Sequence, residues 1–322
     1  MYRKLNSHNN NQQNNTALLI MDNKTQTFLE YKSLLFSIAY NMLGNVDAAE
    51  DIVQDTFLKW IETGSDDVRH RKAYLVKAVT NKCINYLDSA RLKREKYIGV
   101  WLPEPLAGYH IDKAQARTES YHALSIGILI MLEKLTPTER AIFLLKEIFA
   151  YDYYELAKMF DKTEDNCRQI FKRAKDNLGK DAARFKVDVK MHEKVLNKFL
   201  LAVSDGKMED FIGVLKEDII LFADGGGTTL NVGSQRLSAT LKPIYGRENV
   251  SRLLLTVFPK LKHIPDFNQE FIIANGLPTI ISYSGDTPIS VISVEPVDDL
   301  ISNIYIQTNP DKLKRFKKNP EI

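Results

Sequence analysis

The sequence is poor in cysteine, in long apolar runs and in net charge. Cys83 and Cys167 are its only cysteines, and it carries no secretory leader with a basic start, an apolar core and a cleavage site. A disulfide framework is therefore not expected, and the reducing cytoplasm is the expected compartment. The longest strongly apolar run, Ala123 to Leu132, is about half the ~20 residues that a spanning helix needs, so no membrane partner is expected.

Charge is distributed unevenly along a chain whose net charge is only +3. Its 44 Lys and Arg residues nearly cancel its 41 Asp and Glu residues, yet residues 44–67 carry seven acidic side chains and one basic one. Residues 69–97 carry nine basic and two acidic side chains, and residues 168–186 carry seven and two. One acidic block and two basic blocks predict two different kinds of partner.

The chain has 322 residues, which leave room for two or three domains. The sequence pattern of its first half is helical. Asn and Gln fill eight of the ten positions 6–15, which predicts a disordered polar tail over residues 1–24. Apolar residues then follow helical spacing over residues 29–92 and again over 124–178. Pro103 and Pro105 cannot both lie inside a helix, so a linker is expected between these two regions.

The sequence pattern changes after residue 186, and an α+β domain is predicted from residue 187 onward. Its expected helices are Met191 to Val203, Met208 to Lys216 and Glu248 to Phe258. Its expected strands are the β-rich runs Ile219 to Ala223, Phe271 to Ala274, Thr279 to Tyr283, Ile289 to Val294 and Leu300 to Ile306.

The acidic block is predicted to form one helix with two faces. An inward stripe recurs at helical spacing, and it consists of Ala49, Ile52, Val53, Thr56, Phe57 and Trp60. The opposite face, here called the acidic stripe, consists of Asp47, Glu50, Asp51, Gln54 and Asp55, with Leu58 beside it. A solvated face explains such a stripe, but like charges at i and i+4 are mildly destabilising, which favours a basic partner.

The first basic block is also predicted to be a helix with one buried face. Its inward stripe is Leu75, Val76, Val79, Cys83, Tyr86 and Leu87. Around that stripe lie cations suited to phosphate contacts and two amides suited to base or sugar edges: Arg71, Lys72, Lys77, Arg91, Asn81 and Asn85. An ordinary soluble helix remains an alternative. The polar loop from Glu62 to His70 precedes it and is a place where a flipped-out base could be captured.

A helix-turn-helix is predicted over the second helical region. Thr136, Pro137 and Glu139 form a capping-box signature at the start of one helix. A short helix from Tyr153 to Phe160, a turn at Asp161 and Lys162, and a helix capped by Thr163 follow. Cys167, Ile170, Phe171, Ala174 and Leu178 are predicted to face inward in that last helix. Any pair of antiparallel helices can look similar, but outward polar side chains are typical of a recognition helix.

These motifs resemble the sigma-70 family of transcription initiation factors, in particular its extracytoplasmic-function (ECF) group. Residues 48–60, AAEDIVQDTFLKW, resemble the polymerase-binding helix of sigma domain 2, and residues 73–79, AYLVKAV, resemble the start of its minus-ten-reading helix. The helix-turn-helix resembles sigma domain 4, which reads the minus-thirty-five element. The linker leaves no room for sigma domain 3, as in the ECF group.

The resemblance assigns partners and residues. Core polymerase would be bound through the clamp helices of its largest subunit by Asp51, Gln54, Asp55 and Leu58, and its flap region is a second expected contact. Minus-ten DNA would be contacted by Arg71, Lys72, Lys77, Asn81, Asn85 and Arg91. Minus-thirty-five DNA would be contacted by Thr163, Asn166, Arg168, Gln169, Lys172 and Arg173. Many relatives carry Pro where Arg71 stands, and this departure affects the geometry of the loop before the helix, on which the minus-ten preference depends.

A second resemblance concerns the C-terminal part. The linker motif Trp101-Leu102-Pro103-Glu104-Pro105, the motif Asp224-Gly225-Gly226-Gly227 and the final Asn309-Pro310-Asp311-Lys312-Leu313 are similar to ECF factors with a fused SnoaL-like domain. That fold is a cone of helices on a curved sheet, the nuclear-transport-factor-like architecture. The predicted regulatory contact residues are Trp101, Pro103, Pro105, Asp224, Gly225, Gly226, Gly227, Asn309 and Pro310. Thr228 stands where the subgroup usually has Arg.

The expected architecture is thus multidomain. Two all-α sigma domains, domain 2 over residues 25–97 and domain 4 over 121–186, are joined by the linker 98–120 and followed by the SnoaL-like α+β domain over 187–322. The expected function is promoter-directed transcription initiation without enzymatic activity, cofactor or metal, with the C-terminal domain regulating in cis.

Two other functions stay open. A helix-turn-helix regulator that never touches polymerase is the first, and a SnoaL-like enzyme that uses Asp224 as a base with Tyr283 or Tyr305 is the second. The sequence leaves open the promoter sequence, the inducing signal, the oligomeric state and whether the C-terminal pocket takes a small ligand.

Overall fold

The structure is a computed structural model that describes residues 24–62, 70–94, 97–107, 124–179, 212–232, 235–261, 263–297 and 299–318. Its contacts divide the chain into two compact units. Unit 1 comprises residues 1–88, 110–122 and 135–177, and unit 2 comprises residues 89–109, 123–134 and 178–322. The predicted tail, the helix over 191–203 and most of the loop from Glu62 to His70 lie outside the described residues.

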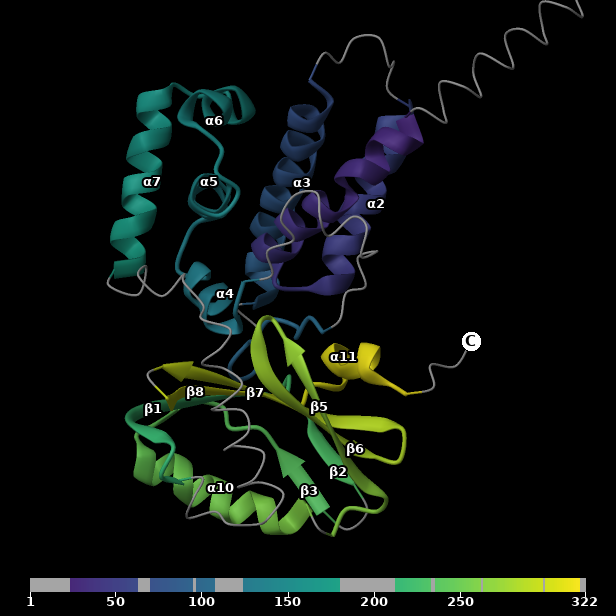
Figure 1. Ribbon diagram of the computed structural model, residues 1–322, viewed down its shortest axis with the longest axis vertical. Helices are drawn as coiled ribbons and strands as arrows, with labels where there is room; N and C mark the ends of the chain where they lie inside the picture. Colours follow the sequence, from purple (N-terminus) through teal and green to yellow (C-terminus); the bar gives the residue numbers. More distant parts are fainter. Residues whose placement is uncertain are drawn as a thin grey trace, which may run out of the picture. The chain divides into compact units, whose positions relative to one another are not determined.

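Unit 1 is helical. A helix over residues 24–43 is followed by α2 (Val46–Glu62), α3 (Arg71–Arg94), α5 (Pro137–Glu147), α6 (Tyr153–Phe160) and α7 (Glu164–Leu178) (Figure 1). Trp60 Nε1 donates to the Lys24 carbonyl at 3.0 Å, and Lys24 Nζ donates to the Ile61 carbonyl at 2.7 Å. These bonds join the first turn of the first helix to the last turn of α2.

Buried side chains hold the first three helices together. Leu35, Ile38 and Met42 are fully buried, as are Leu75 and Val79 on α3. The buried Arg140 of α5 donates through Nη1 to the Met42 carbonyl at 2.7 Å, which places the helix-turn-helix in contact with the first helix. The two predicted helical domains therefore form one compact unit in this structure.

Unit 2 contains a six-stranded sheet in the order β4-β1-β8-β7-β6-β5. β1 and β8 run parallel, and every other neighbouring pair in that sheet is antiparallel. The strands are β1 (Leu215–Asp224), β4 (Ile244–Tyr245), β5 (Phe267–Ala274), β6 (Leu277–Ser284), β7 (Thr287–Val297) and β8 (Leu300–Gln307). A separate hairpin pairs β2 (Thr229–Val232) with β3 (Gln235–Ser238).

The two faces of the sheet are covered by different segments. On one face, Ile219 and Leu221 of β1 pack in a core with Val250 and Leu254 of α10 (Arg247–Leu261). On the other face, alternate residues such as Phe222 and Tyr305 pack against Leu102 of the linker and Ile126 of α4 (Ile126–Leu132). The short helix α11 (Pro310–Leu313) covers the same second face through Leu313, which packs on Tyr283 and Val291.

The fold corrects several predicted elements. Leu215 and Lys216 belong to β1 rather than to a helix, because Leu215 pairs with Ile301 of β8 and this ladder overrides the local helical spacing. Strands β2, β3 and β4 had no counterpart in the prediction. The predicted start of domain 4 at residue 121 also differs from the contact division, which places α4 in unit 2 because its apolar side chains pack on the sheet. The five predicted strands and the predicted helix from Glu248 are confirmed.

Candidate nucleic-acid interface

The acidic stripe lies on the exposed face of α2. The predicted inward residues Ala49, Ile52, Val53, Thr56 and Trp60 are buried, whereas Phe57 is half-buried against the Phe28 ring. Asp51, Gln54 and Asp55 are exposed, and 54% of Leu58 is exposed, a high value for a leucine. Asp55 forms an ion pair with Lys82 of α3, with 3.0 Å between the carboxylate oxygen and the ammonium nitrogen. The face keeps an apolar side chain among carboxylates, which a water-facing helix does not require.

The residues predicted for minus-ten DNA all lie on α3, but their surroundings differ. Arg71 donates to Thr27 Oγ1 at 3.0 Å, and Lys77 pairs with Asp161 at 3.0 Å and also donates to the Lys158 carbonyl at 3.2 Å. Lys72 is half-buried. Asn81 and Asn85 are exposed, and the side chain of Arg91 is outside the described part of the chain.

The inward stripe of α3 is confirmed with one exception. Leu75, Val76, Val79, Cys83 and Leu87 are buried, and burial raises the pKa of the Cys83 thiol. Tyr86 is instead 40% exposed, so its assignment to the inward stripe is wrong. A phenol carries a polar end that water can hydrate, and this allows its partial exposure.

The helix-turn-helix is held by local caps. Thr136 and Glu139 form the predicted capping box, and Asp152 and Glu155 form a second one at the start of α6. Asp161 ends α6 with a left-handed φ of 52°, which turns the chain toward α7. Thr163 Oγ1 accepts from the Asn166 N–H at 3.2 Å and so caps α7 as predicted.

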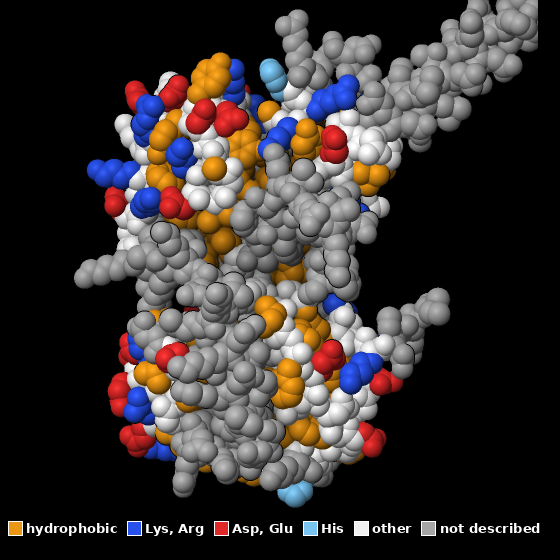
Figure 2. Space-filling view, viewed as in Figure 1, with side chains coloured by type: hydrophobic (Ala, Val, Ile, Leu, Met, Phe, Trp, Pro, Cys, Tyr) orange, Lys and Arg blue, Asp and Glu red, His pale blue; other side chains and the backbone are white. Residues whose placement is uncertain are grey.

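Helix α7, the predicted recognition helix, presents its polar residues to the surface. Cys167, Ile170, Ala174 and Leu178 are buried as predicted, and Phe171 is half-buried. Lys and Arg side chains are mixed with Asp and Glu side chains over this part of the surface (Figure 2). Arg168 pairs with Glu164 at 2.8 Å and Asp165 at 2.7 Å, which fixes its guanidinium along the first turns. The predicted minus-thirty-five residues are all exposed: Thr163, Asn166, Arg168, Gln169, Lys172 and Arg173.

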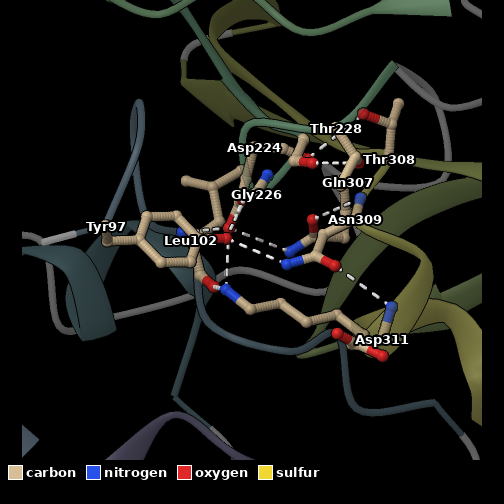
Figure 3. Close-up of polar contacts among 11 residues, drawn as sticks. Tyr97, Leu102, Asp224, Gly226, Thr228, Gln307, Thr308, Asn309 and Asp311 are labelled. Carbon is tan, nitrogen blue, oxygen red and sulfur yellow. Dashed lines mark hydrogen bonds and ion pairs between the residues drawn. The ribbon is translucent and has the colours of Figure 1, made fainter. Parts of the chain in front are cut away.

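The three motifs assigned to regulatory contacts meet at one buried carboxylate (Figure 3). Asp224, at the end of β1, has no exposed surface. Its Oδ1 accepts from the Tyr97 hydroxyl at 2.5 Å and the Gly226 N–H at 3.0 Å. Its Oδ2 accepts from the Leu102 N–H at 2.8 Å and from Lys312 Nζ at 2.7 Å. These residues, together with Asn309, are called the Asp224 cluster below.

Lys312 is a buried cation that joins the linker to the C-terminal segment. Besides its ion pair with Asp224, its ammonium donates to the Leu102 carbonyl at 2.5 Å and lies 4.5 Å from the centre of the Trp101 ring. A buried charge is stable only when it is paired and hydrogen-bonded, and these contacts supply both. Lys312 and Tyr97 were not among the predicted contact residues, although Lys312 lies inside the quoted C-terminal motif.

The glycines after Asp224 are required by close packing. Gly226 and Gly227 have φ values of +60° and +72°, which glycine adopts readily. A Cβ at Gly226 would lie 2.6 Å from Asn309 Nδ2, and one at Gly227 would lie 2.9 Å from Ile98 Cβ. Asn309 Nδ2 in turn donates to the Tyr97 hydroxyl at 2.9 Å. The glycine motif thus lets the linker and the C-terminal segment approach the same loop.

The remaining predicted contact residues occupy the edges of this arrangement. Pro103 and Pro105 are buried in the linker segment, Trp101 is half-buried, and Pro310 is exposed at the first position of α11. Burial, followed by the Asp224 carboxylate, raises the pKa of the Tyr97 phenol, so it remains a neutral donor. Tyr305 donates to Glu295 and Tyr283 to Glu270, so the two tyrosines of the enzyme alternative contact other carboxylates than Asp224.

A second anchor lies at the other end of the linker. Asn275, buried in the β5–β6 turn, accepts from the Leu106 N–H at 2.8 Å and donates through Nδ2 to the Leu124 carbonyl at 2.9 Å. Gly127 of α4 leaves room for Tyr305, whose hydroxyl would lie 2.5 Å from a Cβ there. Sequence reasoning missed this anchor, because a single Asn in a hairpin turn is explained by the preference of Asn for turns and does not by itself predict a long-range contact.

The described residues offer no group of three or more His, Cys, Asp or Glu side chains arranged to hold a metal ion. In the same part of the chain, no helix is both long and apolar enough to cross a membrane.

Comparison with known proteins identifies the family. The family described as Sigma-70 region 2 matches residues 27–92, and the family described as Sigma-70, region 4 matches residues 128–178. The ECF RNA polymerase sigma factor SigJ of Mycobacterium tuberculosis (strain ATCC 25618 / H37Rv) is 26% identical over 289 residues, which cover 86% of this chain and 89% of SigJ. The chain is an ECF sigma factor of the SigJ type.

Two further comparisons extend the similarity, the first over 66% and the second over 90% of the chain. The probable ECF sigma factor SigI from the same strain is 26% identical over 219 residues, covering 66% of this chain and 73% of SigI. The crystal structure of M. tuberculosis SigJ superposes with a TM-score of 0.69 at 23% identity, covering 90% of this chain and 98% of that one. The predicted fold class, helical sigma domains followed by a sheet-containing domain, is confirmed.

Region 4 of the ECF sigma factor begins within α4. The family match starts at residue 128, whereas the contact division leaves residues 123–134 in unit 2. The first helix of region 4 is therefore held by the C-terminal sheet, and α5 to α7 belong to unit 1. Within unit 2 the sheet thus contacts both the linker and the first helix of region 4.

Proposed function

We propose that this ECF sigma factor binds core RNA polymerase through Asp51, Gln54, Asp55 and Leu58. We further propose that α3 recognises minus-ten DNA and α7 minus-thirty-five DNA, and that unit 2 regulates initiation in cis. No enzymatic step is assigned to the chain. The polymerase clamp helices and the flap region are the proposed contact sites on core enzyme.

The observation that carries this proposal is the exposed face of α2 within the matched region 2. Three of its polar residues and Leu58 are exposed while the opposite face is buried. Burying an exposed leucine among charge pairs is typical of a protein interface. The pairing of Asp55 with Lys82 is an exposed ion pair worth at most about 1 kcal/mol, so it is readily exchanged for a partner's cation.

The regulatory part of the proposal is supported by the Asp224 cluster. The linker and α4 flank the two DNA-reading modules in sequence, and both are anchored on the sheet of unit 2. We propose that these anchors restrict how far the two modules separate and so take the place of a separate anti-sigma protein. Such coupling requires contacts that differ between the free and polymerase-bound states, worth about 1 to 3 kcal/mol.

The test is run-off transcription with purified core polymerase on a cognate promoter, found among genomic fragments that include the region upstream of its own gene. Asp51→Lys reverses one exposed charge and is expected to lower initiation at least about tenfold while circular dichroism stays unchanged. Asp218→Lys, an exposed aspartate on β1, is the matched control and should initiate normally. Normal initiation by Asp51→Lys would favour a DNA-binding regulator that acts without polymerase.

A further inference from the structure

Unit 1 contains a hollow that shares Arg71, Lys72 and Lys77 with the proposed minus-ten surface and extends beyond it to α6 and the first helix. It has a volume of about 1260 Å³, and its walls come from the start of α3, the first helix, the turn after α5, and α6. Ligand pockets commonly measure about 300–1,000 Å³, so the hollow can hold a ligand of several hundred daltons.

The lining combines aromatic rings with cations. Five lining residues are aromatic, namely Tyr31, Tyr74, Phe149, Tyr151 and Tyr154. Four are Lys or Arg, namely Arg71, Lys72, Lys77 and Lys158, against Glu155 as the one acidic lining residue. An aliphatic ligand would be matched by leucine and valine, which do not line this hollow. Rings and cations side by side are the chemistry that binds a base and its phosphates.

Tyr154 and Lys158 form the most defined part of that surface. Lys158 Nζ donates to the Tyr154 hydroxyl at 2.6 Å and lies 3.9 Å from the centre of the same ring. The Tyr154 side chain is 57% exposed, so one aromatic surface is available for stacking. An ammonium group carries three N–H donors, and it can add a phosphate oxygen to its existing contact.

The two walls belong to different sigma regions. Tyr74 and Lys77 lie on α3 of region 2, and Tyr154 and Lys158 lie on α6 of region 4. Lys77 and Asp161 already form an ion pair between these regions. A ligand in the hollow would therefore contact both regions at once.

From these observations we propose that the hollow binds a free nucleotide, with its base on the tyrosine rings and its phosphates on Lys158 and the α3 cations. The bound nucleotide holds region 2 and region 4 together. This inference does not rest on promoter recognition, since it is tested on the isolated full-length chain.

The test is isothermal titration calorimetry of the full-length chain with ATP, GTP, pyrophosphate and a short oligo-dT. The expected result is saturable binding of at least one nucleoside triphosphate, weakened about tenfold or more by Tyr154→Ala and by Lys158→Ala, because one stacked base contributes that much affinity. Tyr245→Ala, an equally exposed tyrosine of unit 2, is the matched control and should bind as the unchanged chain does. Circular dichroism confirms that the variants are folded.

Three outcomes would overturn the proposal. The first is the absence of binding to either triphosphate at millimolar concentration, and the second is binding that both variants leave unchanged. The third is selectivity of another kind, in which pyrophosphate binds as tightly as the triphosphates or oligo-dT binds while free nucleotides do not.

Discussion

Charged residues are used in opposite ways in the two units. On α2 and α3 the pair Asp55–Lys82 reaches the surface, with side-chain exposures of 66% for the aspartate and 21% for the lysine. In unit 2 the pair Asp224–Lys312 has side-chain exposures of 0% and 7%. Both pairs are short, at 3.0 and 2.7 Å, so distance does not distinguish them. Burial distinguishes them: the exposed Asp55–Lys82 pair can be replaced by contacts with a partner protein, whereas the buried Asp224–Lys312 pair cannot.

The difference teaches where a substitution acts. A change on the exposed face alters binding and leaves the fold intact, since surface pairs contribute at most about 1 kcal/mol. A change in the Asp224 cluster leaves an unpaired buried charge and alters the fold itself. Binding and stability measurements therefore separate the two regions.

The largest expected effect comes from breaking the buried pair. Lys312→Met leaves Asp224 charged and enclosed, and it should lower the free energy of unfolding by about 3 to 5 kcal/mol. Lys82→Met, which breaks the exposed pair, should lower it by less than about 1 kcal/mol. Urea denaturation measures both, and run-off transcription reports whether regulation changes with the cluster. Equal losses in the two variants would remove the contrast between the units.

The next effect concerns the glycine motif. Gly226→Ala forces a side chain into a left-handed conformation and against Asn309, and it should cost about 2 to 4 kcal/mol. Gly276→Ala has a similar φ of +69° but no atom within 4 Å of the new Cβ. This control should cost only about 1 kcal/mol, measured by the same denaturation. If Gly276→Ala were as costly as Gly226→Ala, backbone strain alone would explain the motif.

A smaller effect is expected on the exposed face of α7, the proposed recognition helix. Lys172→Ala should weaken promoter binding about tenfold, because a charge-assisted contact is lost, and leave the unfolding free energy unchanged. The slope of log affinity against log salt should fall by about 1. Lys260→Ala on α10 is the matched exposed lysine. Fluorescence anisotropy over a salt series checks both, and a salt slope that does not change would exclude Lys172 from phosphate contact.

The smallest expected effect is on the free energy of unfolding at alkaline pH. The pKa of Tyr97 is raised in the folded chain by burial and by Asp224, whereas an unfolded tyrosine ionises near pH ~10. The stability that Tyr97 contributes is thus fully present below that pH and is lost as pH rises above it. Tyr97→Phe should make the fall of the unfolding free energy between pH 9 and 11 shallower. Tyr245→Phe, at an exposed position, should leave the slope unchanged.

Local chemistry explains which parts of the fold were predictable. The helix at Tyr153–Phe160 has the predicted bounds, and the capping box of Thr136 formed as expected, because caps depend on neighbours within a turn. Strands β2 to β4 were missed because they are only two to four residues long, which is too short for a strand period to be recognised. Tyr86 was misplaced because helical spacing alone does not register which rings end at the surface.

The Asp224 cluster was predictable only in part. The three motifs were quoted as contact motifs, and the structure brings all three to one carboxylate. Tyr97 could not be predicted as a member of the cluster, because its partner Asp224 lies 127 residues further along the chain and no local sequence pattern indicates the contact. Asn275 was missed for the same reason, since it contacts Leu106 across 169 residues. Long-range hydrogen bonds need the topology of the sheet before they can be named.

Co-elution of the full-length chain with purified core RNA polymerase at low salt tests the central claim most directly. The account predicts a single complex for the unchanged chain, and it predicts separate elution for the folded Asp51→Lys variant. Failure of the unchanged chain to elute with core polymerase would contradict the assignment of the exposed α2 face.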